Sequence, residues 1–271
     1  MNMTQHPLTE HDRLQVQQSL AEQQAHREHF SGTMREYYDE MSAETPLAAG
    51  VHCEHVADSG WWLHPQETRT EQVIVFIHGG AYMLGSAQAY RGFASQLAVC
   101  TGYSTFVLDY PLAPEHPFPA AGDRVIEILK GLVDSGIEHV ALVGDSAGAA
   151  LSLVALQHPQ LVQKIRAAVL FSPWTDLTFS GASFNDPNTR DPIFQPSILR
   201  DAAAAYLQGA STEDQRASPL FAQYSHLPPL MIQVGTEELL LDDATRLADK
   251  LSEQGGEVQL DIYQGMHHVF Q

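Results

Sequence analysis

The sequence predicts an α/β fold in which a mostly parallel central sheet is flanked by helices on both faces. Short, nearly continuous apolar runs recur along the chain, which is typical of strands buried on both faces. Longer stretches with helical spacing of apolar residues separate these runs. The 271 residues can bury a sizeable core, and neither an internal repeat nor a linker divides them.

The first 45 residues predict helices that cover the main domain. Residues 1–30 are rich in Gln, Glu and His, and their apolar stripe is weak, but Thr9 and Asp12 have the spacing of a helix start. In residues 31–42, Met and Tyr side chains recur at helical spacing. Two interpretations stay open for that second helix, which can be an extra helix packed on the main domain or part of a lid.

The remaining chain alternates between strand and helix patterns. Strands are expected at 51–56, 61–64, 73–77, 105–108, 140–143, 167–171, 230–234 and 258–263. Helices are expected at 87–99, 120–134, 147–157 and 241–254.

Residues 176–225 break this alternation. They contain four prolines and a short helical piece at 198–207, which indicates an insertion that covers the substrate. The expected organisation is therefore N-terminal cap helices at 1–45 and a core at 46–271, with a cap insertion at about 176–210.

The chain is strongly acidic, with 14 Lys and Arg against 33 Asp and Glu and a formal net charge of −19. Nucleic acids and anionic lipid surfaces both require basic patches, so neither is an expected partner. The apolar run at 73–77 is too short to cross a membrane, and the N-terminus lacks a basic-then-apolar signal. We therefore expect a cytoplasmic protein. Its charge disfavours anionic substrates.

Residues Gly144-Asp145-Ser146-Ala147-Gly148 follow the strand expected at 140–143 and precede an Ala/Leu-rich helix. The G-x-S-x-G pattern alone is weak evidence, and a plain strand–helix turn is the alternative. Between a strand and a helix, however, the pattern predicts a strained elbow that exposes Ser146 as a nucleophile. The two glycines are needed because side chains there would collide with the neighbouring strand and helix.

The sequence His-Gly-Gly-Ala at 78–81 follows the strand expected at 73–77. Its glycines let the backbone bend so that N–H groups face a cavity and can hold the oxygen of a tetrahedral intermediate. The predicted oxyanion hole consists of the N–H groups of Gly79, Gly80, Ala81 and Ala147. A simple turn is the alternative interpretation. His78 is expected to orient the loop rather than act as a base.

A general base must lie near Ser146 in space. The best candidate is His268, after the last expected strand, and the adjacent His267 is its rival. The acid that orients the base should follow the preceding strand, where GTEELLLDD spans 235–243. Asp176 is a less favoured acid position.

Together these motifs resemble the hormone-sensitive-lipase-like group of α/β-hydrolase esterases, which includes bacterial lactone hydrolases and acetyl-hydrolases. The resemblance rests on HGGA at 78–81, DYPLAPEHPFPAA at 109–121, GDSAG at 144–148, GTEELLLDD at 235–243 and GMHHVF at 265–270. It covers roughly residues 50–271 and is highly specific, because all the motifs occur in order. It implies the α/β-hydrolase fold with a helical cap.

The resemblance implies that Ser146 is the nucleophile, Glu238 the acid and His268 the base. Many members have Asp where this chain has Glu238, but either carboxylate can orient and stabilise an imidazolium. Asp242 and Asp243 match the end of the acid motif and are expected to stabilise the following turn.

The chain also departs from the family pattern. Ala81 replaces the last glycine of an HGGG motif, and its methyl group is expected to narrow the pocket. Pro111 replaces the Arg of the YRLAPE motif, so an ion pair between that arginine and Glu115 is not expected. The sequence ends at Gln271, whereas members usually continue into a closing helix. Without that helix, we expect one face of the last strand to be exposed and the loop carrying His268 to be looser.

The predicted function is that of a carboxylesterase that hydrolyses short-chain acyl esters or lactones through a Ser-His-Glu triad and an acyl-enzyme. The side chains expected to contact the substrate are Tyr82, Met83, Phe184, Phe194 and Leu207. No cofactor is implied and no metal is expected, because the 14 histidines lack an accompanying carboxylate cluster. The resemblance is compatible with a homodimer.

Two alternatives stay open. One is an amidase, such as a formamidase, with the same triad. The other is a catalytically silent receptor, as in the gibberellin receptors of plants, which keep the serine and lose the histidine. The presence of His268 disfavours the second.

Overall fold

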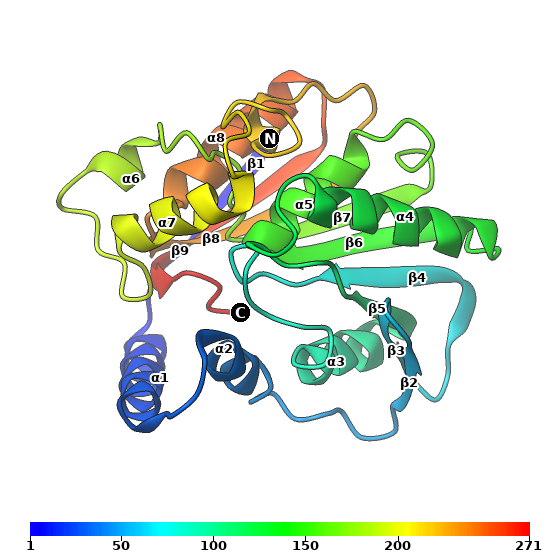
Figure 1. The fold of residues 1–271 in the computed structure, drawn as a ribbon, viewed down its shortest axis with the longest axis horizontal. Helices are drawn as coiled ribbons and strands as arrows, with labels where there is room; N and C mark the ends of the chain where they lie inside the picture. The colour runs from blue at the N-terminus through cyan, green and yellow to red at the C-terminus, as the bar shows by residue number, and fades with distance from the viewer.

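The computed structural model describes the backbone of residues 1–271 and the side chains of all of them except residues 69–71. Its centre is a nine-stranded sheet with the order β1-β9-β8-β7-β6-β4-β5-β3-β2 (Figure 1). The strands are β1 (Asn2–His6), β2 (His52–Val56), β3 (Gly60–His64), β4 (Arg69–Ile77), β5 (Tyr103–Leu108), β6 (His139–Asp145), β7 (Ile165–Phe171), β8 (Leu230–Glu237) and β9 (Val258–His267). Only β3 pairs in the antiparallel sense, with β2 and β5. The expected mostly parallel sheet is confirmed.

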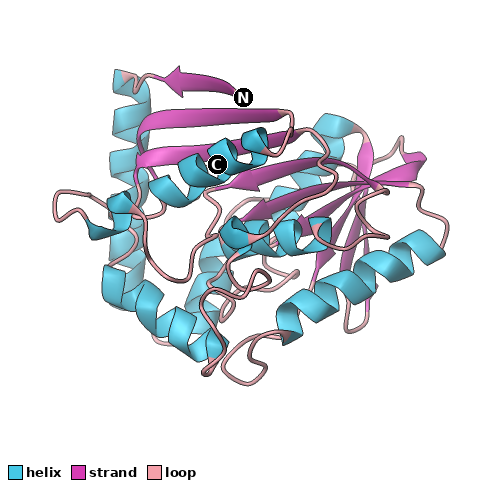
Figure 2. Ribbon diagram, turned by 90° about the horizontal axis from the view of Figure 1, so that it is seen from above, coloured by secondary structure: helices cyan, strands magenta, loops and turns pink.

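Helices lie on both sides of this twisted sheet, as Figure 2 shows. They are α1 (Glu10–His29), α2 (Met34–Ser42), α3 (Arg91–Thr101), α4 (Ala120–Asp134), α5 (Ala147–Leu156), α6 (Ala182–Asn185), α7 (Pro196–Leu207) and α8 (Leu241–Glu253). In the view of Figure 1, α1, α2 and α3 lie below the sheet and α4 to α8 lie above it. The division into core and cap stays a prediction, although α6 and α7 fall within the expected insertion.

Strand β1 and the start of helix α3 differ from the sequence prediction. Strand β1 was not expected, because residues 2–6 are polar and mostly exposed and show no strand-like alternation. They extend the sheet only because β9 offers a free parallel edge, on which Asn2 pairs with Gln259. Helix α3 begins four residues later than expected, since the Ala87 N–H is held by Asp109 at 2.7 Å. The predicted helix start at Thr9 and Asp12 is confirmed as a reciprocal capping box.

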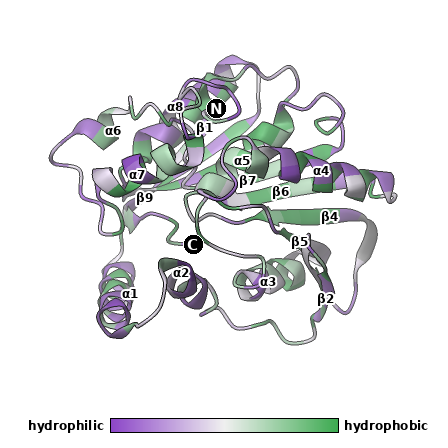
Figure 3. Cartoon of the chain, in the orientation of Figure 1, coloured by the Kyte–Doolittle hydropathy of each residue, from purple (hydrophilic) through white to green (hydrophobic). Residues whose placement is uncertain are grey.

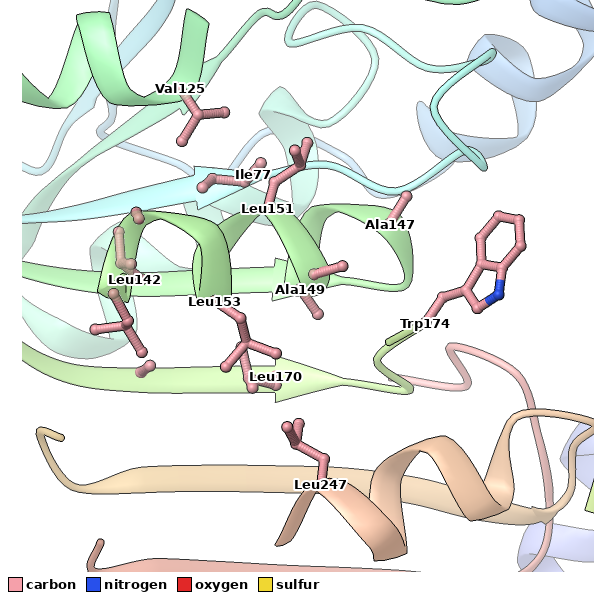
Figure 4. Packing of buried hydrophobic residues seen from close by; sticks show 14 of the residues in the cluster. Ile77, Val125, Leu142, Ala147, Ala149, Leu151, Leu153, Leu170, Trp174 and Leu247 are labelled. Carbon is pink, nitrogen blue, oxygen red and sulfur yellow. The ribbon is translucent and has the colours of Figure 1, made fainter. Parts of the chain in front are cut away.

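The core is divided between the two faces of the sheet. The larger cluster packs α4, α5 and α8 on one face, and the smaller one packs α3 on the other. Helix α5 is buried at all ten positions, which explains why its sequence is apolar all round rather than on one face. Figure 3 shows the contrast between the hydrophobic α5 and the mainly hydrophilic α1. Figure 4 shows Leu153 of α5 close to Leu170 of β7.

None of the helices in the described part of the chain is both long enough and apolar enough to cross a bilayer.

We expect Gly148→Ala to destabilise the protein, because a Cβ at this position would lie 1.9 Å from the carbonyl oxygen of Ile77. Overpacking of this kind costs about 1–3 kcal/mol of the free energy of unfolding, measurable in urea. The control is Gly131→Ala in α4, where a Cβ meets nothing within 4 Å. That variant should be neutral or up to about 1 kcal/mol more stable, because alanine favours helix. Equal effects at the two sites would contradict the packing argument.

Candidate active site

Ser146 lies on a sharp turn between β6 and α5. Its φ of 51° and ψ of −115° are unfavourable for a residue with a side chain and are maintained by neighbouring hydrogen bonds. The Ser146 N–H donates to the Phe171 carbonyl at 2.8 Å, and the Ser146 carbonyl accepts from the Trp174 N–H at 3.2 Å. The predicted strained elbow is thus confirmed as geometry.

Glu238 and His268 come together at the same edge of the sheet. They follow β8 and β9, and the Glu238 Oε2 lies 2.9 Å from the His268 Nδ1. Both side chains are almost completely buried. The structure therefore brings this acid, and not Asp176, to the predicted base. His267, the rival base, instead places its Nδ1 3.0 Å from the His268 carbonyl.

The charge of Glu238 is stabilised by further donors. Its Oε1 accepts hydrogen bonds from the Gly235 N–H at 2.6 Å and from the Ser172 hydroxyl at 2.8 Å. The Ser172 oxygen in turn accepts from the Val269 N–H at 3.1 Å, which ties the loop of His268 to the acid. Ser172 is not among the residues predicted from the sequence, although its position directly after the strand that ends at Phe171 places it at the same sheet edge.

Two opposing effects act on the pKa of His268. Burial disfavours the imidazolium, but the hydrogen bond and the negative charge of Glu238 outweigh burial and raise the pKa of His268 above its ordinary value. Its Nε2 is buried and has no hydrogen-bond partner among the described residues. The second ring nitrogen is therefore free to take a proton from a nucleophile that approaches when substrate binds.

The loop after β4, residues 78–85, is called the oxyanion loop below. Its backbone has positive φ at three consecutive residues, with 105° at Gly80, 54° at Ala81 and 63° at Tyr82. Neither Gly80 nor Ala81 donates its N–H to another described residue. Ala147 is the first residue of α5, so its N–H lacks a carbonyl partner one turn earlier. These three N–H groups are available to an oxyanion.

Gly79 does not fit the predicted oxyanion hole. Its N–H donates to the Asp145 Oδ1 at 2.8 Å, so this donor is already used, and we correct the prediction on that ground. Burial raises the pKa of Asp145 to about 6, although the Gly79 hydrogen bond favours the charged form. The other Asp145 oxygen accepts from the Tyr90 hydroxyl at 3.2 Å. Asp145 thus holds the oxyanion loop rather than the base.

His78 has the structural role that was expected of it. Its ring is fully buried, stacks on Tyr110 with centroids 4.4 Å apart, and places Nδ1 2.8 Å from the Gly79 carbonyl. Burial lowers the pKa of His78, which keeps the ring neutral. The Tyr110 hydroxyl donates to the His78 carbonyl at 2.8 Å and fixes the start of the loop.

The predicted substrate-contacting residues fall into two groups. Phe194 lies edge-on to the His268 ring, with ring centroids 4.9 Å apart. Tyr82, a residue of the oxyanion loop, stacks on Tyr206 with ring centroids 3.8 Å apart. Met83 follows Tyr82 in that loop. Phe184 and Leu207 form the second group and, like Tyr82, belong to the larger core cluster, where Phe184 contacts Phe179.

Trp174 is a second residue that the sequence analysis missed. Its side chain is fully buried, with the ring centroid 5.8 Å from that of Tyr82, and its backbone N–H donates to the Ser146 carbonyl at 3.2 Å. Figure 4 shows it beyond the first turn of α5, near Ala147. Trp174 lies in an irregular loop, so no helix- or strand-like spacing of apolar residues indicated that it would be buried.

The carboxylates near the acid motif have structural partners. The Asp243 Oδ2 accepts from the Thr175 and Asp176 N–H groups at 2.7 and 2.8 Å, and burial raises the pKa of Asp243 to about 8. Asp176 pairs with Arg246 at 3.0 Å. The expected role of Asp243 in stabilising a turn thus extends to the loop after β7. Across the described residues, no group of three or more His, Cys, Asp and Glu is placed to hold a metal ion.

Comparisons with known proteins agree with this fold. A family described as having the alpha/beta hydrolase fold matches residues 74–271. An acetyl-hydrolase of Streptomyces hygroscopicus is 38% identical over 215 residues, which are 77% of this chain and 71% of that protein. An esterase of Acinetobacter venetianus is 37% identical over 207 residues, which are 74% of this chain and 68% of that protein.

A solved structure of an esterase from the bacterial hormone-sensitive lipase family superposes with a TM-score of 0.86 and 32% identity, over 93% of this chain and 89% of the other. Fold and relatives together define the class of this protein, which is an α/β-hydrolase. Within that class, the chain belongs to the hormone-sensitive-lipase-like esterases and is a serine carboxylic ester hydrolase.

We expect Glu238→Gln to move the acid limb of the kcat/KM profile to lower pH. The base must be neutral, so activity rises with pH through the pKa of His268, which Glu238 raises. Without that charge, burial dominates and the pKa falls, while kcat drops by about 10²- to 10⁴-fold because the imidazolium is no longer stabilised. In Asp242→Asn, the matched control, the limb should not move. A larger loss of kcat in Asp242→Asn than in Glu238→Gln would show that Asp242, and not Glu238, is the acid.

We expect Ser172→Ala to lower both activity and stability, since a buried carboxylate loses one donor and the Val269 N–H loses its acceptor. The loss of unfolding free energy should be about 1–3 kcal/mol in urea titrations. Ser152→Ala is the control, because Ser152 is equally buried and its hydroxyl donates only to the Gly148 carbonyl in α5. A normal kcat in Ser172→Ala would show that Ser172 does not support the acid.

Proposed function

We propose that the protein hydrolyses short-chain acyl esters or lactones through Ser146, His268 and Glu238. The observation that carries this proposal is the buried contact of 2.9 Å between Glu238 and His268, at the sheet edge where the strained Ser146 elbow also lies. A buried carboxylate that orients a histidine whose second nitrogen is free is the arrangement that activates a serine.

In the proposed reaction, the Ser146 hydroxyl attacks the ester carbonyl carbon while His268 accepts its proton. The negative oxygen of the tetrahedral intermediate accepts hydrogen bonds from the N–H groups of Gly80, Ala81 and Ala147. Glu238 stabilises the imidazolium. His268 then gives the proton to the leaving alcohol, which departs as the acyl-enzyme forms. Water then attacks the acyl carbon while His268 accepts its proton, the bond between that carbon and the Ser146 Oγ breaks, and His268 returns the proton to Ser146 as the carboxylic acid product is released.

Three features support a small, neutral substrate. Phe194 places a rigid aromatic ring against His268, and Tyr82 of the oxyanion loop is held by stacking on Tyr206. Trp174 adds a fully buried indole next to the nucleophile. The net charge of −19 disfavours anionic esters. The name of the acetyl-hydrolase relative agrees with a short acyl group.

The test is a panel of p-nitrophenyl esters from acetate to octanoate, a set of lactones and an aryl formamide. We expect the highest kcat/KM on the short esters and a loss of roughly 10-fold or more on octanoate, since each misfitting methylene costs on the order of 1 kcal/mol. Ser146→Ala should reduce kcat by roughly 10⁴-fold or more without changing the unfolding transition. Surviving activity in this variant would exclude Ser146 as the nucleophile. Faster turnover of the formamide than of acetate would favour an amidase.

A further inference from the structure

Helix α2 contacts the oxyanion loop and the start of α3 through one face. Arg35 and Asp39 lie one turn apart on that face, with Tyr38 beside them. The Arg35 Nε donates to the Met83 carbonyl at 2.9 Å, and the Asp39 Oδ2 accepts from the Ser86 hydroxyl at 2.9 Å. In Figure 1, α2 lies beside α3 below the sheet. The N-terminal region therefore reaches the backbone that carries the oxyanion donors.

Tyr38 makes a second connection to the same backbone. Its hydroxyl lies 2.8 Å from that of Tyr90, which donates to Asp145, and Asp145 accepts from the Gly79 N–H. Burial raises the pKa of Tyr38 and of Tyr90, so both phenols stay protonated and can donate. This chain of hydrogen bonds joins α2 to the first glycine of the oxyanion loop.

Arg35 is the point at which these connections concentrate. Besides Met83, its guanidinium donates to the Ala113 carbonyl at 2.9 Å and to both Glu115 oxygens, at 2.9 and 2.6 Å. One planar group thus holds two loops together. The same loops are also joined by hydrogen bonds from the Ala113 N–H to the Tyr82 carbonyl at 2.9 Å and from the Tyr110 hydroxyl to the His78 carbonyl. Only a guanidinium offers this many donors in a fixed fork.

The pairing also changes the expectation for Glu115. Position 111 carries Pro instead of the arginine of the YRLAPE motif, so no ion pair was expected there. The structure supplies an arginine from a different element, and the Arg35 hydrogen bonds lower the pKa of Glu115 to about 2. The arginine that pairs with Glu115 is therefore supplied by the N-terminal helix α2 rather than by the motif itself. From α2, Arg35 also reaches the oxyanion loop at Met83.

We infer that Arg35 is a positioning residue for the oxyanion hole. The loop has three consecutive residues with positive φ, two of which are not glycine, and such a backbone persists only when surrounding contacts hold it. Arg35 supplies one of these contacts at Met83, two residues after Ala81. Docking of α2 therefore sets the direction of the Gly80 and Ala81 N–H groups. This inference rests on the proposed catalytic role of that loop.

The effect should fall on kcat rather than on KM. The donors of an oxyanion hole are aligned to the charged intermediate and contribute little to ground-state binding. Removing one such donor outright costs about 10²- to 10³-fold in kcat, so misaligning two of them through Arg35→Ala should cost about 10- to 100-fold. KM should change by less than about 3-fold, as expected when only transition-state contacts are lost.

The experiment compares Arg35→Ala, Arg35→Lys and Glu115→Gln on p-nitrophenyl acetate. Arg35→Lys keeps the charge but not the planar fork, so it should recover little activity. Glu115→Gln leaves both carbonyl contacts of Arg35 in place and should stay near wild-type kcat. Arg27→Ala, which removes an exposed arginine from α1, is the control for loss of charge from the N-terminal helices. All rates are divided by the fraction of protein that an aryl phosphonate labels, so that unfolded molecules do not count.

A second measurement separates positioning from general stability. A trifluoromethyl ketone forms a tetrahedral oxyanion, so its inhibition constant should rise in Arg35→Ala by the same factor as kcat falls. A normal kcat per labelled site, or a change confined to KM, would overturn the inference. Equal losses in Glu115→Gln and Arg35→Ala would also overturn it, because the ion pair alone would then account for the effect. Activity that survives in Ser146→Ala would instead overturn the proposed function.

Discussion

Helix α5 lies so close to strand β4 that Gly148 has no room for a side chain between the helix and the Ile77 carbonyl. This contact fixes where the first turn of α5 sits, and with it the strained backbone of Ser146. Because β4, β6 and β7 are parallel neighbours, their ends meet at one edge. The oxyanion loop and the loop that begins with Ser172 therefore flank the same serine. The site is a consequence of this close approach, and the other side chains are arranged around it.

Buried carboxylates hold the loops at this edge in place. Glu238, Asp145 and Asp243 are each buried, and each accepts main-chain N–H hydrogen bonds, at Gly235, at Gly79 and at Thr175 with Asp176. Main-chain N–H groups favour the charged form of these carboxylates and oppose the effect of burial. Desolvation still raises the pKa of Asp145 and Asp243, whereas Glu238 has the additional partner His268. The acidic character of the chain thus extends into its interior, where a few carboxylates connect loops that are distant in sequence.

The N-terminal helices take part in the same arrangement from the opposite side of the sheet. Through Arg35, α2 reaches the loop that carries two of the proposed oxyanion donors, and through Tyr38 and Tyr90 it reaches Asp145. A helix whose residues all keep some exposed surface can therefore influence the site by a small number of hydrogen bonds. This links the docking of a peripheral element to the alignment of N–H groups in the transition state.

The sequence by itself determined the parallel sheet, the order of its buried strands and helices and the elbow at Ser146, and it predicted the pair Glu238 and His268 that the structure brings together. These features depend on local patterns, such as apolar runs and glycines beside a serine, or on motifs that the family shares. The tertiary structure alone decided that β1 joins the sheet and that the Gly79 N–H donates to Asp145. It also decided that the Ser172 hydroxyl donates to Glu238 and that Arg35 pairs with Glu115 in place of an arginine at position 111. Each of these contacts joins residues far apart along the chain. Hydrogen-bond partners are selected by position in space, and no local pattern in the sequence records that position.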